Sequence, residues 1–408
     1  MDVATARALL TEQGQSQLLR FYQELSCKEQ AALLAQLEEV DWGLPQLIRG
    51  KRAELARGAL APMGALTLDE IALARGDYER AGLEALQAGS VGAVLLAGGQ
   101  GTRLGFPKPK GMLDIGLTRH LYLFEALIQN LLEVVRRAGA WVPLYVMTNR
   151  KNHDETERFF VEHGYFGYQP DRVFFFPQDM VPAVDEAGHI LLESKGSIAL
   201  CPNGNGGWFS SMIHAGLLEA LHRDGVCWLN VFSVDNVLQR IADPCFVGAT
   251  ILSGHDCGAK VVRKATPNER VGVLCYEDGR PSIVEYYEMT EAMTRLRNAD
   301  GSLAYNFGVI LNYLFRVEQL ERIAGLRLPY HVVHKKVPYV NGKGEVVQPA
   351  EPNAYKFETL VLDMIHMMPN CLSYEVERQR EFAPIKNLTG ADSLDTAREL
   401  LAQNGVNL

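Results

Sequence analysis

The chain has 408 residues, of which 47% are hydrophobic and 22% charged, a balance typical of folded globular proteins that excludes intrinsic disorder. A single compact core rarely extends over so long a chain, so two or three domains are expected. The formal net charge of −9 at pH 7 argues against a nucleic-acid partner, because such partners bind to basic surfaces.

The N-terminal segment, residues 1–88, is expected to be helical. Leu33, Leu34 and Leu37 recur at helical spacing, and so do the apolar side chains between Leu18 and Leu25. No cluster of catalytic residues occurs in this segment. We therefore expect it to pack as a helical cap on a larger domain.

From Val91 onward, apolar strands alternate with amphipathic helices. The expected strands are 91–96, 144–147, 173–176 and 227–232, and the expected helices are 120–137, 154–162 and 208–222. This alternation predicts an α/β fold with a Rossmann-like, mostly parallel central sheet that helices cover on both faces. Ligands of such folds usually bind beyond the carboxyl ends of the strands.

The pattern becomes richer in strands after residue 260. Strands are expected at 259–262, 271–276 and 282–286, as antiparallel additions around the pocket. From about residue 325 the chain mixes strands with two helices, which predicts a small C-terminal α+β domain. The expected domains are therefore 1–88, 89–325 and 326–408.

The first expected strand leads directly into a glycine-rich loop, Leu96-Ala97-Gly98-Gly99-Gln100-Gly101-Thr102-Arg103-Leu104-Gly105. Clustered glycines allow a ligand to approach the backbone, and exposed N–H groups in such a turn bind anionic oxygens. Arg103 adds a fixed positive charge and Lys110 a mobile one. A Walker loop is excluded because GxxxxGK[ST] is absent, and a dinucleotide GxGxxG motif is excluded because Leu104 replaces its last glycine. The loop therefore predicts a phosphate site of another kind.

Polar residues follow two further strands, and a second glycine-rich turn precedes a helix. The Gln178 amide could pair with a nucleobase edge, although a loop glutamine without a ligand is the alternative. The single carboxylate of Asp235 suits Mg²⁺, which binds to one or two carboxylates together with phosphate oxygens; a helix cap is the alternative. The turn Pro202–Gly207 is by itself as consistent with a capping turn as with a binding loop.

The glycine-rich loop, followed by Pro109-Lys110-Gly111-Met112, resembles the signature of the UDP-sugar pyrophosphorylases. The closest resemblance is to the eukaryotic-type UDP-N-acetylhexosamine pyrophosphorylases, and it continues in the same order from about residue 90 to about residue 390. It implies a nucleotide-diphospho-sugar transferase fold of the GT-A-like type. It also implies that UTP and a hexose 1-phosphate are converted into a UDP-sugar and pyrophosphate with Mg²⁺.

The resemblance assigns roles to individual residues. The residues expected to bind the nucleotide are Leu96, Ala97, Gly98, Gly99, Gln178, Gly204 and Asn205. The residues expected to bind the sugar are Asp235, Gly272, Glu285 and Asn306. The residues expected to act in catalysis are Arg103, Lys110 and Lys386, and Asp235 is also the expected Mg²⁺ ligand. Catalysis is then positioning plus charge neutralisation, with in-line attack of the sugar phosphate on the α-phosphorus and no covalent enzyme intermediate.

Three positions depart from the acetylhexosamine pattern. Leu360 and Leu362 replace two aromatic residues that line the N-acetyl region, and Phe307 is bulkier than the small residue usual beside Asn306. N-Acetylglucosamine 1-phosphate is the expected acceptor, while glucose 1-phosphate or a broad range of sugar phosphates is the alternative. A catalytically inactive protein that binds nucleotide sugars is an alternative of another class, but it would not need all four charged residues of the expected site.

The cysteines and apolar runs indicate the compartment. Seven cysteines occur without a CxxC pair, so neither a zinc ribbon nor a dithiol redox centre is expected. Cys227 and Cys275 lie in apolar runs and are expected to be small buried hydrophobes in a reducing compartment. No secretory signal is recognised, and the apolar runs are far shorter than the roughly 20 residues of a membrane helix. We therefore expect a cytoplasmic protein without a membrane partner.

Overall fold

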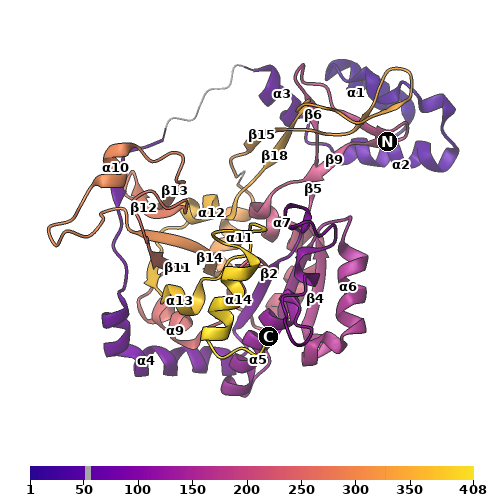
Figure 1. Ribbon diagram of the computed structural model, residues 1–408. Coiled ribbons are helices and arrows are strands. Elements are labelled where there is room, and N and C mark those ends of the chain that lie inside the picture. Colours follow the sequence, from indigo (N-terminus) through magenta and orange to yellow (C-terminus); the bar gives the residue numbers. More distant parts are fainter. Residues whose placement is uncertain (51–56, 327) are drawn as a thin grey trace. The chain divides into compact units, whose positions relative to one another are not determined.

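The computed structural model describes residues 1–50, 57–326 and 328–408 (Figure 1). The chain forms two compact units, each assembled from separate stretches of sequence. The first unit comprises Met1–Ala56, Asp179–Gly207 and Leu328–Leu360, and the second comprises Arg57–Gln178, Trp208–Arg327 and Val361–Leu408. From the sequence we expected three consecutive domains instead, because local patterns do not show which distant segments pack together.

The second unit is built on four parallel strands in the order β10-β2-β3-β4. Their bounds are β2 (Val91–Leu96), β3 (Leu144–Thr148), β4 (Val173–Pro177) and β10 (Trp228–Ser233). Every residue of β2 and β3 is buried, as their continuous apolar sequences predict for parallel strands covered on both faces. The predicted parallel core is therefore confirmed.

Antiparallel strands extend this core into one sheet, which has ten strands among the described residues. β14 (Phe307–Arg316) pairs antiparallel with β10, β11 and β12. The other members are β1 (Leu60–Pro62), β11 (Cys257–Arg263), β12 (Val273–Glu277), β13 (Arg280–Val284) and β19 (Leu372–Glu375). The expected antiparallel additions are thus present, and β1 is a strand that helical spacing in the N-terminal segment did not reveal.

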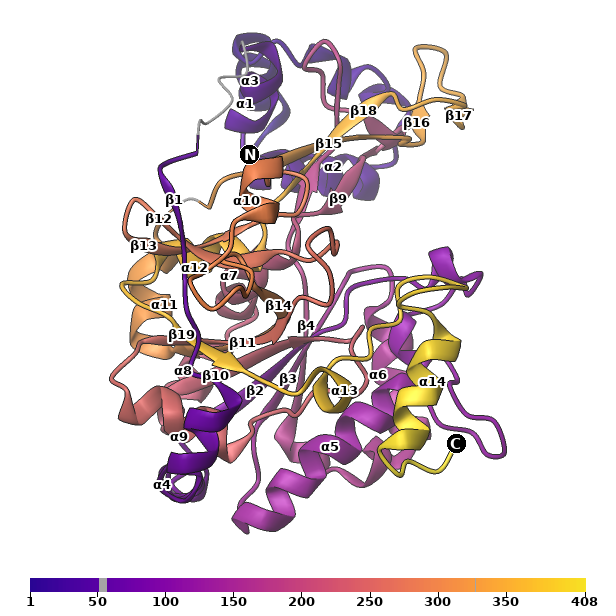
Figure 2. The same ribbon diagram turned by 60° about the vertical axis from the view of Figure 1, so that its left-hand side comes forward.

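Helices cover both faces of this sheet. On one face, Ala93 and Leu95 of β2 share a core with apolar side chains of α4 (Leu68–Gln87), α5 (Leu123–Ala138), α6 (His153–Glu162) and α9 (Pro244–Leu252). On the other face, Trp208 of α7 (Trp208–His214) packs against Phe315 of β14 with ring centroids 6.2 Å apart. Figure 2 shows α4 and α9 side by side below the strands.

Two glycines allow the close crossing of α4 and α9. A Cβ atom on Gly82 would lie 1.9 Å from the carbonyl oxygen of Pro244, and one on Gly248 would lie 1.8 Å from that of Tyr78. Both obstacles are backbone atoms, which cannot move away as a flexible side chain could. The two helices can therefore approach this closely only with glycine at both positions.

The remaining helices of the second unit are short, except for the last one. Their bounds are α8 (Leu217–Arg223), α10 (Glu291–Arg295), α11 (Val317–Ala324), α12 (Val361–Met367), α13 (Arg378–Glu381) and α14 (Leu394–Gln403). The single helix expected at 208–222 is wrong: α7 and α8 are separate, because Gly216 adopts the left-handed conformation with φ 74°. The described residues after position 325 form three helices, α12, α13 and α14, where two were expected.

The first unit combines the N-terminal helices α1 (Val3–Glu12), α2 (Cys27–Glu39) and α3 (Gly43–Arg49) with short antiparallel strands. These strands are β5 (Met180–Pro182), β6 (Val184–Asp185), β7 (Leu192–Ser194), β8 (Ser197–Ile198), β9 (Leu200–Pro202), β15 (His331–Lys335), β16 (Tyr339–Val340), β17 (Val346–Val347) and β18 (Ala354–Glu358). Leu33 and Leu37 share one buried core with Val184 and Phe357. The helices therefore cap strands that come from much later in the sequence.

Two local expectations are corrected. The segment from Leu18 to Leu25 forms two short 3₁₀ turns, Ser16–Leu19 and Tyr22–Glu24, instead of a helix. Cys227 is exposed in the turn before β10, although Cys275 is buried as expected. In the described part of the chain, no helix combines the length and the apolar character needed to cross a membrane.

Candidate functional site

The glycine-rich loop leaves the carboxyl end of β2 and folds back on itself. The N–H of Gly101 donates to the carbonyl of Lys108 at 3.0 Å, and the N–H of Lys110 donates to the carbonyl of Gly99 at 3.1 Å. The loop is fixed to β3 because the side-chain amide of Asn149 donates to the carbonyl of Gly98. It is therefore a defined turn, attached to the sheet at its base.

The tip of this loop offers backbone donors. Within the described ranges, no acceptor receives a hydrogen bond from the backbone N–H of Gly98, Gly99 or Gln100. Gly99 and Gln100 are exposed. Successive N–H groups that point to solvent in a glycine-rich turn form a concave site for anionic oxygens. Arg103 follows in a 3₁₀ turn, Thr102–Leu104, and is exposed.

Lys110 and Asp235 form an ion pair beyond the carboxyl ends of the central strands β2 and β10. The Nζ atom of Lys110 lies 2.5 Å from Oδ1 of Asp235, and the two side chains are 10% and 35% exposed. The 3₁₀ turn Lys110–Met112 packs tightly on α5, because a Cβ atom on Gly111 would lie 2.2 Å from the ring of Phe124. The ammonium group is therefore held in place by the packing of its own turn.

The segment that carries Lys386 is attached to the Asp235 loop through its backbone. The N–H of Ile385 donates to the carbonyl of Asp235 at 2.9 Å, and the N–H of Ala383 donates to Oδ1 of Asn236 at 2.8 Å. Lys386 is exposed and follows directly. The structure thus brings Lys110 and Asp235 together with the segment that carries Lys386, although these residues are far apart in the sequence.

Gln178 lies against the base of the glycine-rich loop. Its N–H donates to the carbonyl of Thr148 at 2.7 Å, and its side chain is buried. The space beside it is limited, since a Cβ atom on Gly98 would lie 3.0 Å from Oε1 of Gln178. The expected nucleobase and phosphate contacts are therefore adjacent.

Three of the four residues expected to bind the sugar, Gly272, Glu285 and Asn306, lie together on the antiparallel part of the sheet. A Cβ atom on Gly272 would lie 3.4 Å from Oε1 of Glu285. Gly272 and Asn306 directly precede β12 and β14, which pair with each other through Val273 and Gly308. A carboxylate and an amide at one point suit the hydroxyl groups of a sugar.

Two features that support the expected site were not recognised in the sequence: the Arg57–Glu288 ion pair beside Glu285, and Asn149 beside the glycine-rich loop. Oε2 of Glu288 accepts a hydrogen bond from the N–H of Glu285 at 2.9 Å, and the Arg57 guanidinium lies 2.7 Å from the same atom. A distance of more than two hundred residues separates Arg57 from this loop, so no local pattern could reveal the pair. Asn149 was also missed, although it follows a buried strand as Gln178 does and carries the same signal.

Gly204 and Asn205 belong to the first unit. Gly204 has φ 87°, and a Cβ atom there would lie 2.2 Å from the carbonyl oxygen of Thr359. The turn is fixed by hydrogen bonds from the N–H of Thr359 to the carbonyl of Asn203 at 2.7 Å and from the N–H of Gly206 to the carbonyl of Thr359 at 2.9 Å. Glycine is therefore required for this turn to lie against its neighbour.

The donors for a metal ion are few. Over residues 1–50, 57–326 and 328–408, no three His, Cys, Asp or Glu side chains are grouped so that they could hold a metal. Asp235 nevertheless offers one partly exposed carboxylate beside the glycine-rich loop. This fits Mg²⁺, which keeps several water ligands and takes phosphate oxygens from a bound nucleotide.

Comparison with known proteins shows the same combination of fold and motifs. Residues 76–402 match the family model described as UTP–glucose-1-phosphate uridylyltransferase. UDP-N-acetylhexosamine pyrophosphorylase-like protein 1 from Homo sapiens is 39% identical over 423 positions, covering 97% of this chain and 83% of that protein. The UDP-N-acetylglucosamine pyrophosphorylase of Saccharomyces cerevisiae is 34% identical, covering 96% of this chain and 88% of the yeast protein.

Solved structures agree with these relatives. The uridine diphosphate N-acetylglucosamine pyrophosphorylase of Trypanosoma brucei, solved with an inhibitor, is 29% identical with a TM-score of 0.81, covering 98% of this chain and 84% of that chain. The UDP-glucose phosphorylase of the same organism, at 18% identity and a TM-score of 0.67, shares the fold. The expected family is confirmed: the chain belongs to the UDP-sugar pyrophosphorylases and is a nucleotidyltransferase.

Proposed function

We propose that the protein transfers the uridylyl group of UTP to a hexose 1-phosphate, with N-acetylglucosamine 1-phosphate as the preferred acceptor. The observation that carries this proposal is the meeting of Lys110, Asp235 and the Lys386 segment beside a loop with unpaired backbone donors. An anion of high charge is needed to occupy such a place. UTP and a sugar phosphate together provide it.

In the proposed reaction, an oxygen of the sugar phosphate attacks the α-phosphorus of UTP. The bond from that phosphorus to the bridging oxygen breaks, and pyrophosphate leaves with the electron pair. No proton has to move for this exchange. The protein therefore contributes position and positive charge, which act most strongly where water is excluded.

The N–H groups of Gly98 and Gly99 bind the polyphosphate in this proposal, together with backbone atoms of Leu96 and Ala97 at the end of β2. Arg103 and Lys110 neutralise the leaving pyrophosphate. Lys110 is available for this task because its partner in the structure, Asp235, is partly exposed and can take another cation. Lys386, exposed at the end of the attached segment, neutralises the sugar phosphate.

We propose that Gln178 recognises the uracil edge through its amide. Gly204 and Asn205 are proposed as contacts of the base and ribose, on the family resemblance. Asp235 would hold Mg²⁺ when the nucleotide is bound. The ion would supply charge neutralisation on the phosphate oxygens.

Gly272, Glu285 and Asn306 are proposed to bind the sugar, with Asp235 beside the phosphate. The bulky Phe307 next to Asn306 is buried, and the guanidinium carbon of Arg263 lies 5.6 Å from its ring centroid. Phe307 thus has a partner within the protein, and its size does not by itself exclude an acetamido group. Relatives that are 34% to 39% identical and named for N-acetylhexosamine or N-acetylglucosamine support this acceptor over glucose 1-phosphate.

The test is pyrophosphate release with UTP and a panel of N-acetylglucosamine, N-acetylgalactosamine, glucose and galactose 1-phosphates, with Mg²⁺ or with chelator. We expect the highest kcat/KM with N-acetylglucosamine 1-phosphate and loss of turnover with chelator. Selective release with glucose 1-phosphate would contradict the proposed acceptor. Binding of UDP-sugars without turnover of any substrate would favour a nucleotide-sugar-binding protein instead.

We propose that the protein acts in the cytoplasm. All seven cysteines are free thiols, as expected in a reducing compartment.

A further inference from the structure

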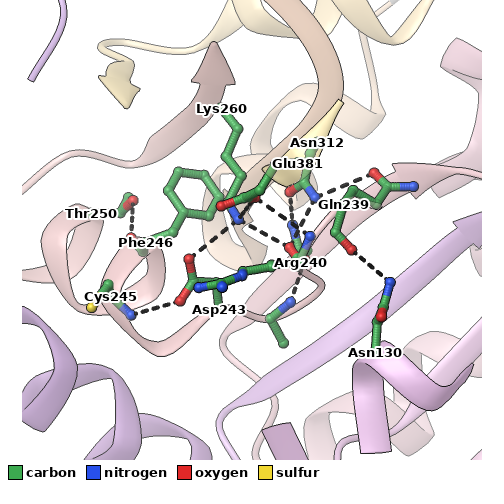
Figure 3. A network of polar contacts seen from close by, with 12 residues as sticks. Asn130, Gln239, Arg240, Asp243, Cys245, Phe246, Thr250, Lys260, Asn312 and Glu381 are labelled. Atoms are coloured by element: carbon green, nitrogen blue, oxygen red, sulfur yellow. Dashed lines mark hydrogen bonds and ion pairs between the residues drawn. The ribbon is translucent and has the colours of Figure 1, made fainter. Parts of the chain in front are cut away.

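A lysine and a glutamate form an ion pair in the interior of the second unit (Figure 3). The Nζ atom of Lys260 lies 2.6 Å from Oε2 of Glu381 and 3.3 Å from Oδ2 of Asp243. The Lys260 side chain has no exposed surface, and that of Glu381 is 8% exposed. Charged groups are rarely buried to this extent, because removing them from water costs several kcal/mol per ion.

The position of Lys260 in β11 explains how it reaches this pair. The register between β11 and β14 shifts here, because Ala259 pairs with Tyr313 and Val261 with Val309, but the extra residues lie in β14 and Lys260 keeps the regular alternation of β11. Lys260 therefore lies on the same face of β11 as Gly258, where an added Cβ atom would lie 2.8 Å from the ring of Phe246. The ammonium group also lies 5.5 Å from the ring centroid of Phe246, which covers it on one side.

The pair joins the two segments that carry site residues. On one side, Lys260 Nζ donates to the carbonyl of Arg240 at 3.1 Å, in the loop that starts at Asp235. On the other side, the carbonyl of Glu381 accepts a hydrogen bond from the Asn236 side-chain amide at 2.7 Å. Glu381 therefore contacts the Asp235 loop with its backbone and the buried lysine with its side chain, five residues before Lys386.

A second set of side-chain amides fixes the same loop. Asn312 donates to the carbonyl of Arg240 at 3.2 Å, and Gln239 donates to the carbonyl of Ser233 at 2.6 Å. Asn130 of α5 donates to the carbonyls of Val237 and Gln239 at 3.2 and 3.3 Å. The loop after β10 is thus held by side chains from β14 and α5, and Lys260 links this assembly to the C-terminal segment.

We propose that Lys260 and Glu381 are positioning residues, which set the place of Lys386 relative to Asp235 during uridylyl transfer. This inference rests on the proposed roles of Asp235 and Lys386. Neither Lys260 nor Glu381 touches substrate. They act by fixing the backbone from which Lys386 extends.

Stability alone does not account for this pair. Two apolar side chains of similar size would fill the same volume. Such replacements of buried ion pairs often leave the stability of the fold unchanged or increase it. An ion pair differs from an apolar contact because its short distance fixes direction as well as proximity. Burial raises the pKa of the Glu381 carboxyl above its usual range, while the nearby Lys260 ammonium acts in the opposite direction.

The test is the double variant Lys260→Met/Glu381→Met, which removes both charges and keeps the volume. Asp243 stays bonded to the N–H of Cys245, and the Arg240 carbonyl keeps its bond from Asn312. We expect a Tm close to that of wild type and an unchanged KM for UTP. The expected fall in kcat is about tenfold to a hundredfold, because a displacement of about 1 Å can cost a hundredfold.

Three further variants make the result decisive. Asn236→Ala cuts the bond to Glu381 without changing any buried charge and should lower kcat in the same way, even if the double variant does not fold. Glu381→Gln keeps an oxygen acceptor for Lys260 and should retain most of the wild-type kcat. Asp256→Asn breaks an ion pair with Arg316, 3.3 Å long, just before β11, and should leave kcat unchanged.

The last step combines the double variant with Lys386→Ala. If the pair acts through Lys386, its replacement has no further effect on kcat when Lys386 is absent, so the effects are not additive. Wild-type kcat in the double variant and in Asn236→Ala would overturn the inference, as would an additive loss. Absence of pyrophosphate release by the wild type would contradict the proposed function itself, whereas full activity of Lys386→Ala would contradict the role of Lys386 and, with it, this inference.

Discussion

Lys110→Met removes the ammonium group next to the glycine-rich loop and keeps the length of the side chain. The Lys110 side chain is only 10% exposed, so water molecules cannot take its place and compensate for the lost positive charge. Two unit charges about 4 Å apart interact by about 4 kcal/mol at an effective dielectric constant of about 20. Loss of one preorganised donor to a developing charge costs about 2.7–4 kcal/mol in other enzymes, or about 10²–10³ in kcat. We expect a loss of kcat in this range.

The fold should survive this change. Asp235 is 35% exposed, so its carboxylate becomes hydrated when Lys110 is replaced, and pairs of this exposure contribute no more than about 1 kcal/mol. We therefore expect Tm to fall by less than about 4 °C. The assay is steady-state pyrophosphate release at saturating UTP and sugar phosphate, with Tm measured on the same samples.

Lys108→Met is the matched control. Lys108 carries the same charge on the same loop, but its side chain is exposed. Its replacement should change kcat by less than about threefold, because water screens an exposed charge. A kcat of Lys110→Met within tenfold of wild type would refute the reasoning, and so would an equal loss in Lys108→Met.

Three other perturbations test separate parts of the structure. Gly98→Ala should raise the KM for UTP at least several-fold, in initial-rate measurements, because its Cβ atom would lie 3.0 Å from Oε1 of Gln178; an unchanged KM would contradict the uracil contact. Gly82→Ala should lower the free energy of unfolding by about 3 kcal/mol or more in urea titrations, since overpacking against backbone cannot relax as side chains do. The pKa of the Glu277 carboxyl is subject to opposing effects, of which partial burial raises it. Hydrogen bonds from the N–H of Gly58 and the hydroxyl of Ser282, together with the Arg57 guanidinium, outweigh burial and lower this pKa below 4.5. The ionised carboxylate therefore stabilises the fold above pH 4.5, and this stability is lost as the pH falls below that value. Arg57→Met should weaken the dependence of Tm on pH in that acidic range. An identical pH profile of Tm would show that the pair is not coupled to folding.

The parts of the fold that follow from local pattern were predictable. Continuous apolar runs predicted the four parallel strands, and the glycines after the first strand predicted a tight turn at that place. Asp235 could be placed at a strand end for the same reason. The break between α7 and α8 depends on one glycine with positive φ, and a helical pattern does not reveal whether the chain uses that freedom.

Contacts between distant segments could not be predicted in this way. Lys260 and Glu381 are separated by 121 positions, and in isolation each is typical of a solvated surface residue. Their burial depends on the place of β11 between β14 and β19 and on the return of the C-terminal segment to the Asp235 loop. The composition of the first unit has the same origin, since its helices and strands come from three separate stretches.

That composition has a consequence for synthesis on the ribosome. Leu33 and Leu37 of α2 share their buried core with Phe357, which is translated more than three hundred residues later. Until that residue leaves the exit tunnel, the N-terminal helices lack part of the core that covers their apolar faces, and exposed apolar faces favour aggregation. Nascent chains that stop before β18 should therefore require chaperones, and slower translation would lengthen this vulnerable period rather than assist folding.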